Sequence, residues 1–133
     1  MFDYFKAQGL DNLIWVWTTE TGDTDWYPGD QYVDIIGRDL YGNDAADCAS
    51  QYQMTVSEHG NKMVTLSECG ANIDANAELG LLSEQWNAGA RWLWFMPWYD
   101  GEGVSLSHAN QEWWLDAMSQ TYVISRDQLP SFK

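Results

Sequence analysis

Short apolar runs alternate along the chain with longer segments in which apolar residues recur at helical spacing. Four runs have the composition of strands, because β-branched and aromatic residues dominate them and glycine, asparagine or proline bounds them. These runs cover residues 12–17, 32–37, 62–70 and 90–96. We therefore expect four strands, with the third run typical of a strand that is covered on both faces.

The segments around these strands are expected to be helical, with one exception. Apolar residues at helical spacing predict a helix that Asn43 or Asp44 caps, and Gly9 marks the end of an N-terminal helical segment. Residues 18–29 lack that spacing and contain turn signals, so the first strand should lead into a long loop. The expected helices cover residues 2–8, 43–59, 74–87 (capped by Asp74) and 107–118 (capped by Ser107).

Strands that alternate with helices form βα units, whose right-handed crossovers place the strands in one parallel sheet. The fold class is therefore α/β. The chain has 133 residues, the length of one globular domain, and we expect residues 1–133 to form a single (β/α)4 unit. Four strands do not close a small barrel, so the outer edges of the first and last strands should lack a neighbour.

Glu68 ends the apolar part of the third expected strand, directly after Val64–Ser67. Barrels of the α/β class place their catalytic residues at the carboxyl ends of the strands, which makes Glu68 the candidate catalytic carboxylate. A second interpretation fits the spacing equally well, because a carboxylate at this position can cap a loop or the following helix. The residue pattern alone leaves both interpretations open.

The charge balance restricts the partners of the chain. Six basic and twenty acidic residues give a formal charge of −14 at pH 7, whereas nucleic acids are bound by clustered lysine and arginine. A neutral ligand suits this surface better. The nine tryptophans and seven tyrosines favour a sugar, whose rings stack on aromatic faces, although most tryptophans in proteins serve as core or interface anchors.

Metal, cofactor and membrane sites are not expected from the sequence. Cys48 and Cys69 lack a C-x-x-C partner and are interpreted as small buried side chains. His59 and His108 are far apart and match no metal-binding spacing, and no cofactor motif is present. No apolar run approaches the ~20 residues that a membrane-spanning helix requires.

Several segments together resemble glycoside hydrolase family 26, whose best-known members are endo-β-1,4-mannanases. The resemblance covers nearly the whole chain and rests on segments 12–17, 26–37, Asp39 with Tyr41, Ser67-Glu68, and 94–98. It implies an eight-stranded (β/α) barrel that hydrolyses its substrate with retention through two glutamates. The four strands of this chain would then be strands five to eight, half of a TIM barrel, and the substrate β-mannan or a related glucan or xylan.

The resemblance also implies roles for individual residues. Glu68 matches the nucleophile at the end of strand seven, and Tyr41 matches a tyrosine that hydrogen-bonds and orients the nucleophile. Trp98 matches the aromatic platform beneath the reacting sugar. Trp17 occupies an aromatic position that lines the cleft, and Trp26 is a further candidate for substrate binding.

The chain departs from the family pattern at the second glutamate. In the family, the acid/base glutamate follows a histidine directly at the end of strand four, and no His-Glu pair occurs here. Glu58-His59 has the reverse order and precedes a strand, where barrel chemistry does not occur. Other acids near the catalytic end are expected in polar loops, where solvation explains them; they are Glu20, Asp39, Asp100 and Glu102.

Three functions therefore compete. The first is a retaining glycoside hydrolase, mannanase-like, that carries the nucleophile without the acid/base half and turns over polysaccharide poorly alone. The second is a carbohydrate-binding remnant, and the third a structural half-barrel. A homodimer could pair the fourth strand of each copy with the first strand of the other and so complete eight strands. The alternative is an open or domain-swapped assembly. The sequence assigns no location, although members of the resembled family are usually secreted or attached to the microbial surface.

Overall fold

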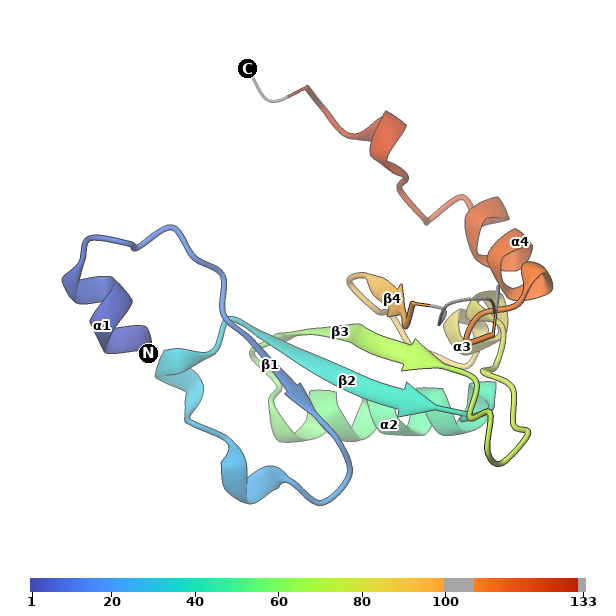
Figure 1. Ribbon diagram of the computed structural model, residues 1–133, viewed down its shortest axis with the longest axis horizontal. Helices are drawn as coiled ribbons and strands as arrows, with labels where there is room; N and C mark the ends of the chain where they lie inside the picture. Colours follow the sequence, from blue (N-terminus) through green and yellow to red (C-terminus); the bar gives the residue numbers. More distant parts are fainter. Residues whose placement is uncertain (100–106, 132–133) are drawn as a thin grey trace.

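A computed structural model of the chain describes residues 1–99 and 107–131. It contains four strands and four α-helices, in the order shown in Figure 1. The elements are α1 (Phe2–Ala7), β1 (Val16–Thr19), β2 (Ile35–Tyr41), α2 (Ala45–Glu58), β3 (Met63–Gly70), α3 (Leu82–Asn87), β4 (Phe95–Pro97) and α4 (Gln111–Ser119), with short 3-10 turns η1 (Thr24–Trp26), η2 (Asp30–Tyr32) and η3 (Arg126–Gln128).

The four strands form one parallel sheet in the order β1-β2-β3-β4. The predicted parallel sheet is therefore confirmed. Each strand lies beside its neighbour in the sequence, so β2 and β3 form the centre, and β1 and β4 form the edges of the described sheet. The carboxyl ends of all four strands meet along one edge, which we call the carboxyl edge.

One face of the sheet packs against the helices. Figure 1 shows α2 running along the sheet beneath β2 and β3. The core on this face contains Leu40 from β2, Leu66 and Cys69 from β3, and Cys48 from α2, together with residues of α3 and α4. Both cysteines are buried and unpaired, which confirms their predicted role as small core side chains.

The opposite face of the sheet is more polar and depends on a glycine. The hydroxyl groups of Thr18 in β1 and Ser67 in β3 share a hydrogen bond of 3.0 Å that crosses Gly37 of the intervening strand β2. A Cβ atom at Gly37 would lie 2.3 Å from Ser67 Oγ. Only glycine at position 37 therefore leaves room for the hydrogen bond between Thr18 and Ser67, which links β1 to β3 across β2.

The N-terminal helix is held by aromatic contacts. The ring of Phe2 lies 5.5 Å from that of Trp15 and 5.2 Å from that of Tyr32, measured between centroids. Figure 1 shows α1 standing apart from the sheet, joined to β1 by an extended segment. The connection from β1 to β2 contains only η1 and η2, which confirms the long loop predicted over residues 18–29.

Strand boundaries differ from the predictions in a way that affects the site. The second strand begins at Ile35 and continues to Tyr41, so Asp39 and Tyr41 lie within a strand and not in a loop after it. The first strand is shifted toward the C-terminus and the fourth is reduced to Phe95–Pro97. Apolar content located each strand, but its hydrogen-bonded length depends on the neighbouring strand, which composition does not record.

Two helix predictions are also corrected. Residues 74–81 are not helical, because Asn72 and Ala77 form an antiparallel bridge around a turn and α3 begins only at Leu82. The side chain of Asn72 accepts a hydrogen bond from the N–H of Ala75, which stabilises this turn in place of a helix. The last helix is capped by Asn110, not by Ser107, whereas Asp44 caps α2 as one of the two predicted candidates.

Candidate active site

Glu68 lies in β3, at the carboxyl edge of the sheet. The strand pairing shifts at this point: Arg38 pairs with Leu66, but Asp39 pairs with Glu68, so β3 contains one extra residue, Ser67. This bulge explains why Leu66 and Cys69, three positions apart, both face the helical core. The bulge also turns the side chain of Glu68, which lies between these two residues, toward the polar face. The side chains of Asp39 and Tyr41 are on this face too, because successive side chains of β2 alternate between the two faces.

A tyrosine orients the carboxylate of Glu68. The hydroxyl group of Tyr41 donates a hydrogen bond of 3.0 Å to Glu68 Oε1. Burial raises the pKa of the Tyr41 phenol, and its hydrogen bond to Glu68 and the charge of that carboxylate raise the pKa further. Tyr41 therefore stays protonated and remains a donor at neutral pH. The sequence named these two residues as partners, and the structure brings them together.

Asp39 is a second carboxyl beside Glu68 that the sequence reasoning undervalued. It does not lie in a polar loop: it stands opposite Glu68 in the strand pairing. Its Oδ1 atom is buried and lacks a hydrogen-bond partner among the described residues. Burial raises the pKa of Asp39 to about 6, with further contributions from the charges of Glu68 and Glu20, and Arg38 acts in the opposite direction. Only the strand register reveals this placement.

His108 is a neighbour of Tyr41 that the sequence gave no role. Its ring meets the ring of Tyr41 edge to face, with centroids 5.7 Å apart and planes at 83°. Both rings border an open cavity of about 390 Å³, whose other lining residues include Asn72 and Asp74. A second open cavity of about 370 Å³ lies against Tyr41, Asp39 and Glu20. No sequence spacing connects His108 with Tyr41, because the contact joins the end of β2 to the segment before α4.

Trp98 lies at the carboxyl edge directly after β4. Its backbone N–H donates a hydrogen bond of 2.8 Å to the carbonyl oxygen of Cys69, the residue that follows Glu68. Trp98 is 40% exposed, and its ring packs against that of Tyr99, with centroids 4.8 Å apart. Its expected role as a platform beneath the reacting sugar stays a prediction. Asp100 and Glu102, two of the other acids considered, lie outside the described residues.

Trp17 is not placed in a cleft with Glu68, which corrects its expected role. It pairs with Ile36, so its side chain is on the same face as that of Arg38, which bonds to Gln51 of α2. Its ring packs against Tyr27 and His59, at 4.8 and 5.9 Å between centroids. The expectation failed because a strand turns successive side chains to opposite faces, and the register was unknown.

Trp26 is also separated from Glu68. It belongs to η1, and the residue is 81% exposed. The next residue, Tyr27, contacts His59 at the end of α2, so this part of the loop lies along the helical face. Glu58 and His59 end α2, at the opposite edge of the sheet from Glu68, where the sequence argument placed them.

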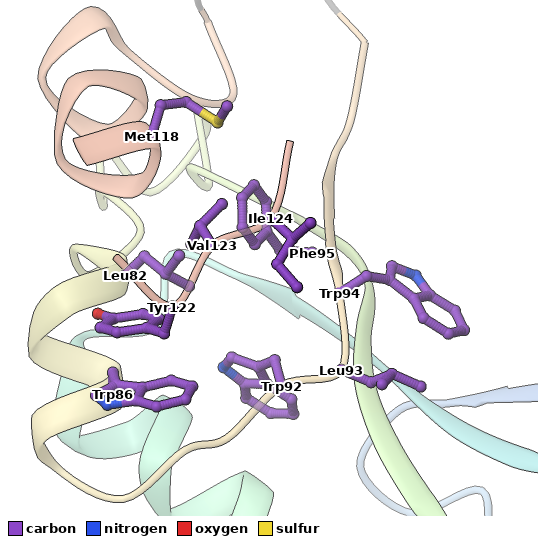
Figure 2. Close-up of a pocket in the computed structure, with 10 residues that line it drawn as sticks. All are labelled: Leu82, Trp86, Trp92, Leu93, Trp94, Phe95, Met118, Tyr122, Val123 and Ile124. Carbon is purple, nitrogen blue, oxygen red and sulfur yellow. The ribbon is translucent and has the colours of Figure 1, made fainter. Parts of the chain in front are cut away.

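An apolar cavity lies elsewhere in the described residues. It measures about 270 Å³ and is lined by residues such as Trp86, Trp92, Phe95, Met118 and Tyr122. Figure 2 shows the rings of Trp86 and Tyr122 lying parallel at its wall; their centroids are 3.8 Å apart. The side chains in it are mostly apolar, whereas sugar hydroxyls need hydrogen-bonding partners. It does not suit a carbohydrate.

Over residues 1–99 and 107–131, no group of three or more histidine, cysteine, aspartate and glutamate side chains is arranged to hold a metal ion. In the same ranges, each helix is too short or too polar to cross a bilayer. The site offers a carboxylate that a phenol orients by a hydrogen bond, and carboxylates are among the groups that can form covalent intermediates in glycosidases.

Barrels of the α/β class place their chemistry at the carboxyl ends of the strands, and most glycoside hydrolases use carboxyl groups for it. The comparison with known proteins identifies the class more closely. The sequence model of glycosyl hydrolase family 26 matches residues 1–128. The chain belongs to this family, as the resemblance in the sequence indicated.

Individual relatives agree with this assignment. A mannan endo-1,4-beta-mannosidase of Thermothelomyces thermophilus is 31% identical over 126 residues, which are 94% of this chain and 24% of that protein. The GH26 domain of an endo-beta-mannanase/endo-beta-glucanase from Prevotella bryantii is 46% identical, with a TM-score of 0.83 over 96% of this chain and 38% of that chain. A beta-(1,4)-mannanase of Podospora anserina is 31% identical, with a TM-score of 0.70 over 93% of this chain and 26% of that chain.

These figures define the fold and its extent. Four parallel strands with flanking helices match part of family 26 barrel domains, so the fold is an α/β half-barrel. The chain spans about a quarter of the first curated relative and less than half of the solved domain from Prevotella bryantii. What those whole proteins do is therefore a basis for proposals about this chain.

Proposed function

We propose that this chain carries the nucleophile part of a retaining β-mannan hydrolase, with its four strands in the places of strands five to eight. The observation that carries the proposal is the hydrogen bond from Tyr41 to Glu68 at the carboxyl edge. The mannanase names of the relatives in both comparisons support mannan as the substrate. The position of Trp98 beside Cys69 supports a sugar platform next to that carboxylate.

In this proposal, Glu68 attacks the anomeric carbon of a mannosyl residue. A carbon–oxygen bond to Glu68 forms while the glycosidic bond breaks, and the electron pair leaves with the departing oxygen, which takes a proton from a general acid. Water then attacks the same carbon, gives up a proton and releases Glu68 as a carboxylate. Tyr41 holds the carboxylate in line with the carbon and stabilises its charge through the hydrogen bond.

The general acid is not assigned to a described residue. Retaining hydrolysis needs a second carboxyl ~5–5.5 Å from the nucleophile, on the leaving-group side of the sugar. Asp39 stands opposite Glu68 in the neighbouring strand, whereas the family resemblance places the acid/base glutamate at the end of strand four. We propose that the acid comes from a complementary half of the barrel and that this chain alone hydrolyses polysaccharide poorly.

A second copy of the chain is our preferred source of the missing strands. Apolar side chains are exposed near both open edges of the sheet, among them Val16 in β1 and Leu93 and Met96 beside or in β4. Each copy carries a charge of −14, so salt should favour the pairing by screening repulsion. Sedimentation velocity at low and high salt tests this proposal. A dimer that grows with salt supports it, and a monomer at every salt concentration contradicts it.

Carbohydrate binding without turnover is the second candidate function. It is favoured by the partly exposed ring of Trp98 and by the lack of an assigned acid. The two candidates differ at the nucleophile, because binding needs no attack by Glu68.

The test uses a 2-fluoromannoside with a highly activated leaving group, which departs without a proton, while the fluorine slows release of the covalent intermediate. We expect the intact mass of the wild-type chain to rise by one 2-fluoromannosyl group. The Glu68→Gln variant should not gain this mass. A folded wild-type chain that binds mannotriose without labelling would support binding alone, and a chain that does neither would contradict both candidates.

A further inference from the structure

His108 is anchored beside the strand that carries Glu68. The backbone N–H of Ala71 donates a hydrogen bond of 2.7 Å to the carbonyl oxygen of His108. In return, Nδ1 of His108 lies 3.4 Å from the carbonyl oxygen of Ala71. These contacts join the segment before α4 to the end of β3, within three residues of Glu68. The position of the imidazole is thus set by the same strand as the carboxylate.

Gly70 allows this ring to reach Tyr41. A Cβ atom at position 70 would lie 2.8 Å from Cβ of His108 and 3.1 Å from both Nδ1 of His108 and Cε1 of Tyr41. The rings therefore meet in a space that any other residue at this position would fill. The result is a chain of contacts from His108 to the ring of Tyr41, and from the hydroxyl of Tyr41 to Glu68.

Tyr41 depends on neighbours for its orientation. It is the last residue of β2 and is followed by Gly42, whose φ of +69° turns the chain away from the strand. Open cavities border its ring on two sides, toward Asp39 and toward Asn72. Among the described residues, the ring of Tyr41 contacts the ring of His108 edge to face. Such contacts favour one relative orientation of the two rings.

We propose that His108 is a positioning residue of the site: its ring holds Tyr41 in the orientation in which the phenol donates to Glu68. This inference rests on the proposed function, because it assigns a step to the same nucleophile. The imidazole acts through its shape and its contact with Tyr41, and it exchanges no proton in this account.

The test measures the rate constant of labelling by the activated 2-fluoromannoside and, separately, the concentration that gives half-maximal rate. We expect His108→Ala to lower the rate constant about three- to tenfold, the scale of one aromatic contact, with little change in the half-maximal concentration. His108→Phe keeps a ring and should recover most of the rate. Gly70→Ala should also slow labelling, because its Cβ separates the two rings.

A double variant separates positioning from general damage. If His108 acts through the hydroxyl of Tyr41, His108→Ala should have little further effect in a Tyr41→Phe background, because coupled residues are not additive. Full additivity of the two effects would overturn the proposal. His59→Ala is the matched control: its ring also packs edge to face, on Trp17, but at the other edge of the sheet. It should leave the labelling rate unchanged.

The outcomes distinguish this inference from the proposed function. Wild-type protein that is never labelled overturns the proposed function. Wild-type protein that is labelled at the same rate as a folded His108→Ala variant, with folding checked by thermal melting, overturns the positioning role alone. Failure of His108→Phe to recover the rate, when it melts like the wild type, would overturn it as well.

Discussion

Two clusters in this half-barrel contain the same types of side chain. At the carboxyl edge, Tyr41 donates to Glu68 and packs against His108. On the helical face, Tyr27 donates a hydrogen bond of 2.7 Å to Asp30 and packs against His59. We call these the edge cluster and the outer cluster. A tyrosine, a carboxylate and a histidine in contact therefore do not define an active site by themselves.

The clusters differ in what surrounds the carboxylate. Asp30 is three residues from Tyr27, and their hydrogen bond is exposed and local. Glu68 is 27 residues from Tyr41, is turned to the polar face by a bulge, and has Asp39 opposite it. The edge cluster is thus built by the pairing of two central strands, and this pairing gives the carboxylate a fixed direction.

The largest expected effect comes from removing one hydroxyl in each cluster. Tyr41→Phe should slow labelling by the activated 2-fluoromannoside about 10- to 100-fold, because a hydrogen bond to a charged group contributes ~1.5–3 kcal/mol. Tyr27→Phe removes an equivalent bond from the outer cluster and should leave the labelling rate unchanged. Equal effects of the two variants on labelling would abolish the distinction between the clusters.

The next largest effect is expected from replacing a glycine close to each cluster. Gly37→Ala places a Cβ 2.3 Å from Ser67 Oγ and should lower the free energy of unfolding by about 1–3 kcal/mol, as overpacking does. It should also slow labelling, because Ser67 precedes Glu68. Gly60→Ala, beside His59, meets only a backbone oxygen at 3.3 Å. Urea unfolding should show a much smaller loss for it, and the reverse order would contradict the tight bridge over Gly37.

The tryptophans sharpen the comparison through substrate affinity. Trp98→Ala should raise the half-maximal concentration of the 2-fluoromannoside ~5- to 30-fold, the usual cost of truncating an aromatic anchor. Trp17→Ala should lower the melting temperature, because Tyr27 and His59 lose a packing partner, and leave the concentration dependence as in the wild type. A Trp17 variant that binds the sugar weakly while folded would restore its expected place in the cleft.

The smallest effect concerns the proton on Asp39. Its pKa is raised to about 6 in the folded chain, above the ~3.9 of an unfolded aspartate. Folding therefore favours the neutral form of Asp39. The neutral carboxyl adds its full contribution to the free energy of unfolding below pH 4, and this contribution is lost as the pH rises through 6. The stability of Asp39→Asn relative to wild type, measured as the difference in the free energy of unfolding in urea, should rise by about 1 kcal/mol from pH 4.5 to pH 7.5. The full pKa shift would give a larger change, but the partial exposure of Asp39 reduces it. A constant difference across this range would contradict the raised pKa.

The sequence predicted what depends on composition and order. The parallel sheet, α2 with its Asp44 cap, the loop after β1 and the buried cysteines followed from local patterns, and the family resemblance paired Tyr41 with Glu68. What it did not predict depends on register. The bulge at Ser67, the position of Asp39 opposite Glu68, and the direction of Trp17 follow from which residues pair across strands, and a shift by one residue reverses each face.

The contacts of His108 illustrate the same limit. Its approach to Tyr41 requires the space left by Gly70 and a backbone bond to Ala71. The sequence around His108 does not indicate either of these contacts, because Gly70 and Ala71 are far from it in the chain. In the third helix, Asp74 looked like a cap, but Asn72 formed a turn instead, because side-chain hydrogen bonds to the backbone compete with helix formation.

The most direct measurement of the central claim is the location of the covalent label. Trypsin should release residues 63–91, which contain Glu68, separately from residues 39–62, which contain Asp39. We predict that the 2-fluoromannosyl group is found on the first peptide and that fragmentation places it on Glu68. A label on Asp39 or another carboxyl, or a folded chain that takes up no label, would contradict the account.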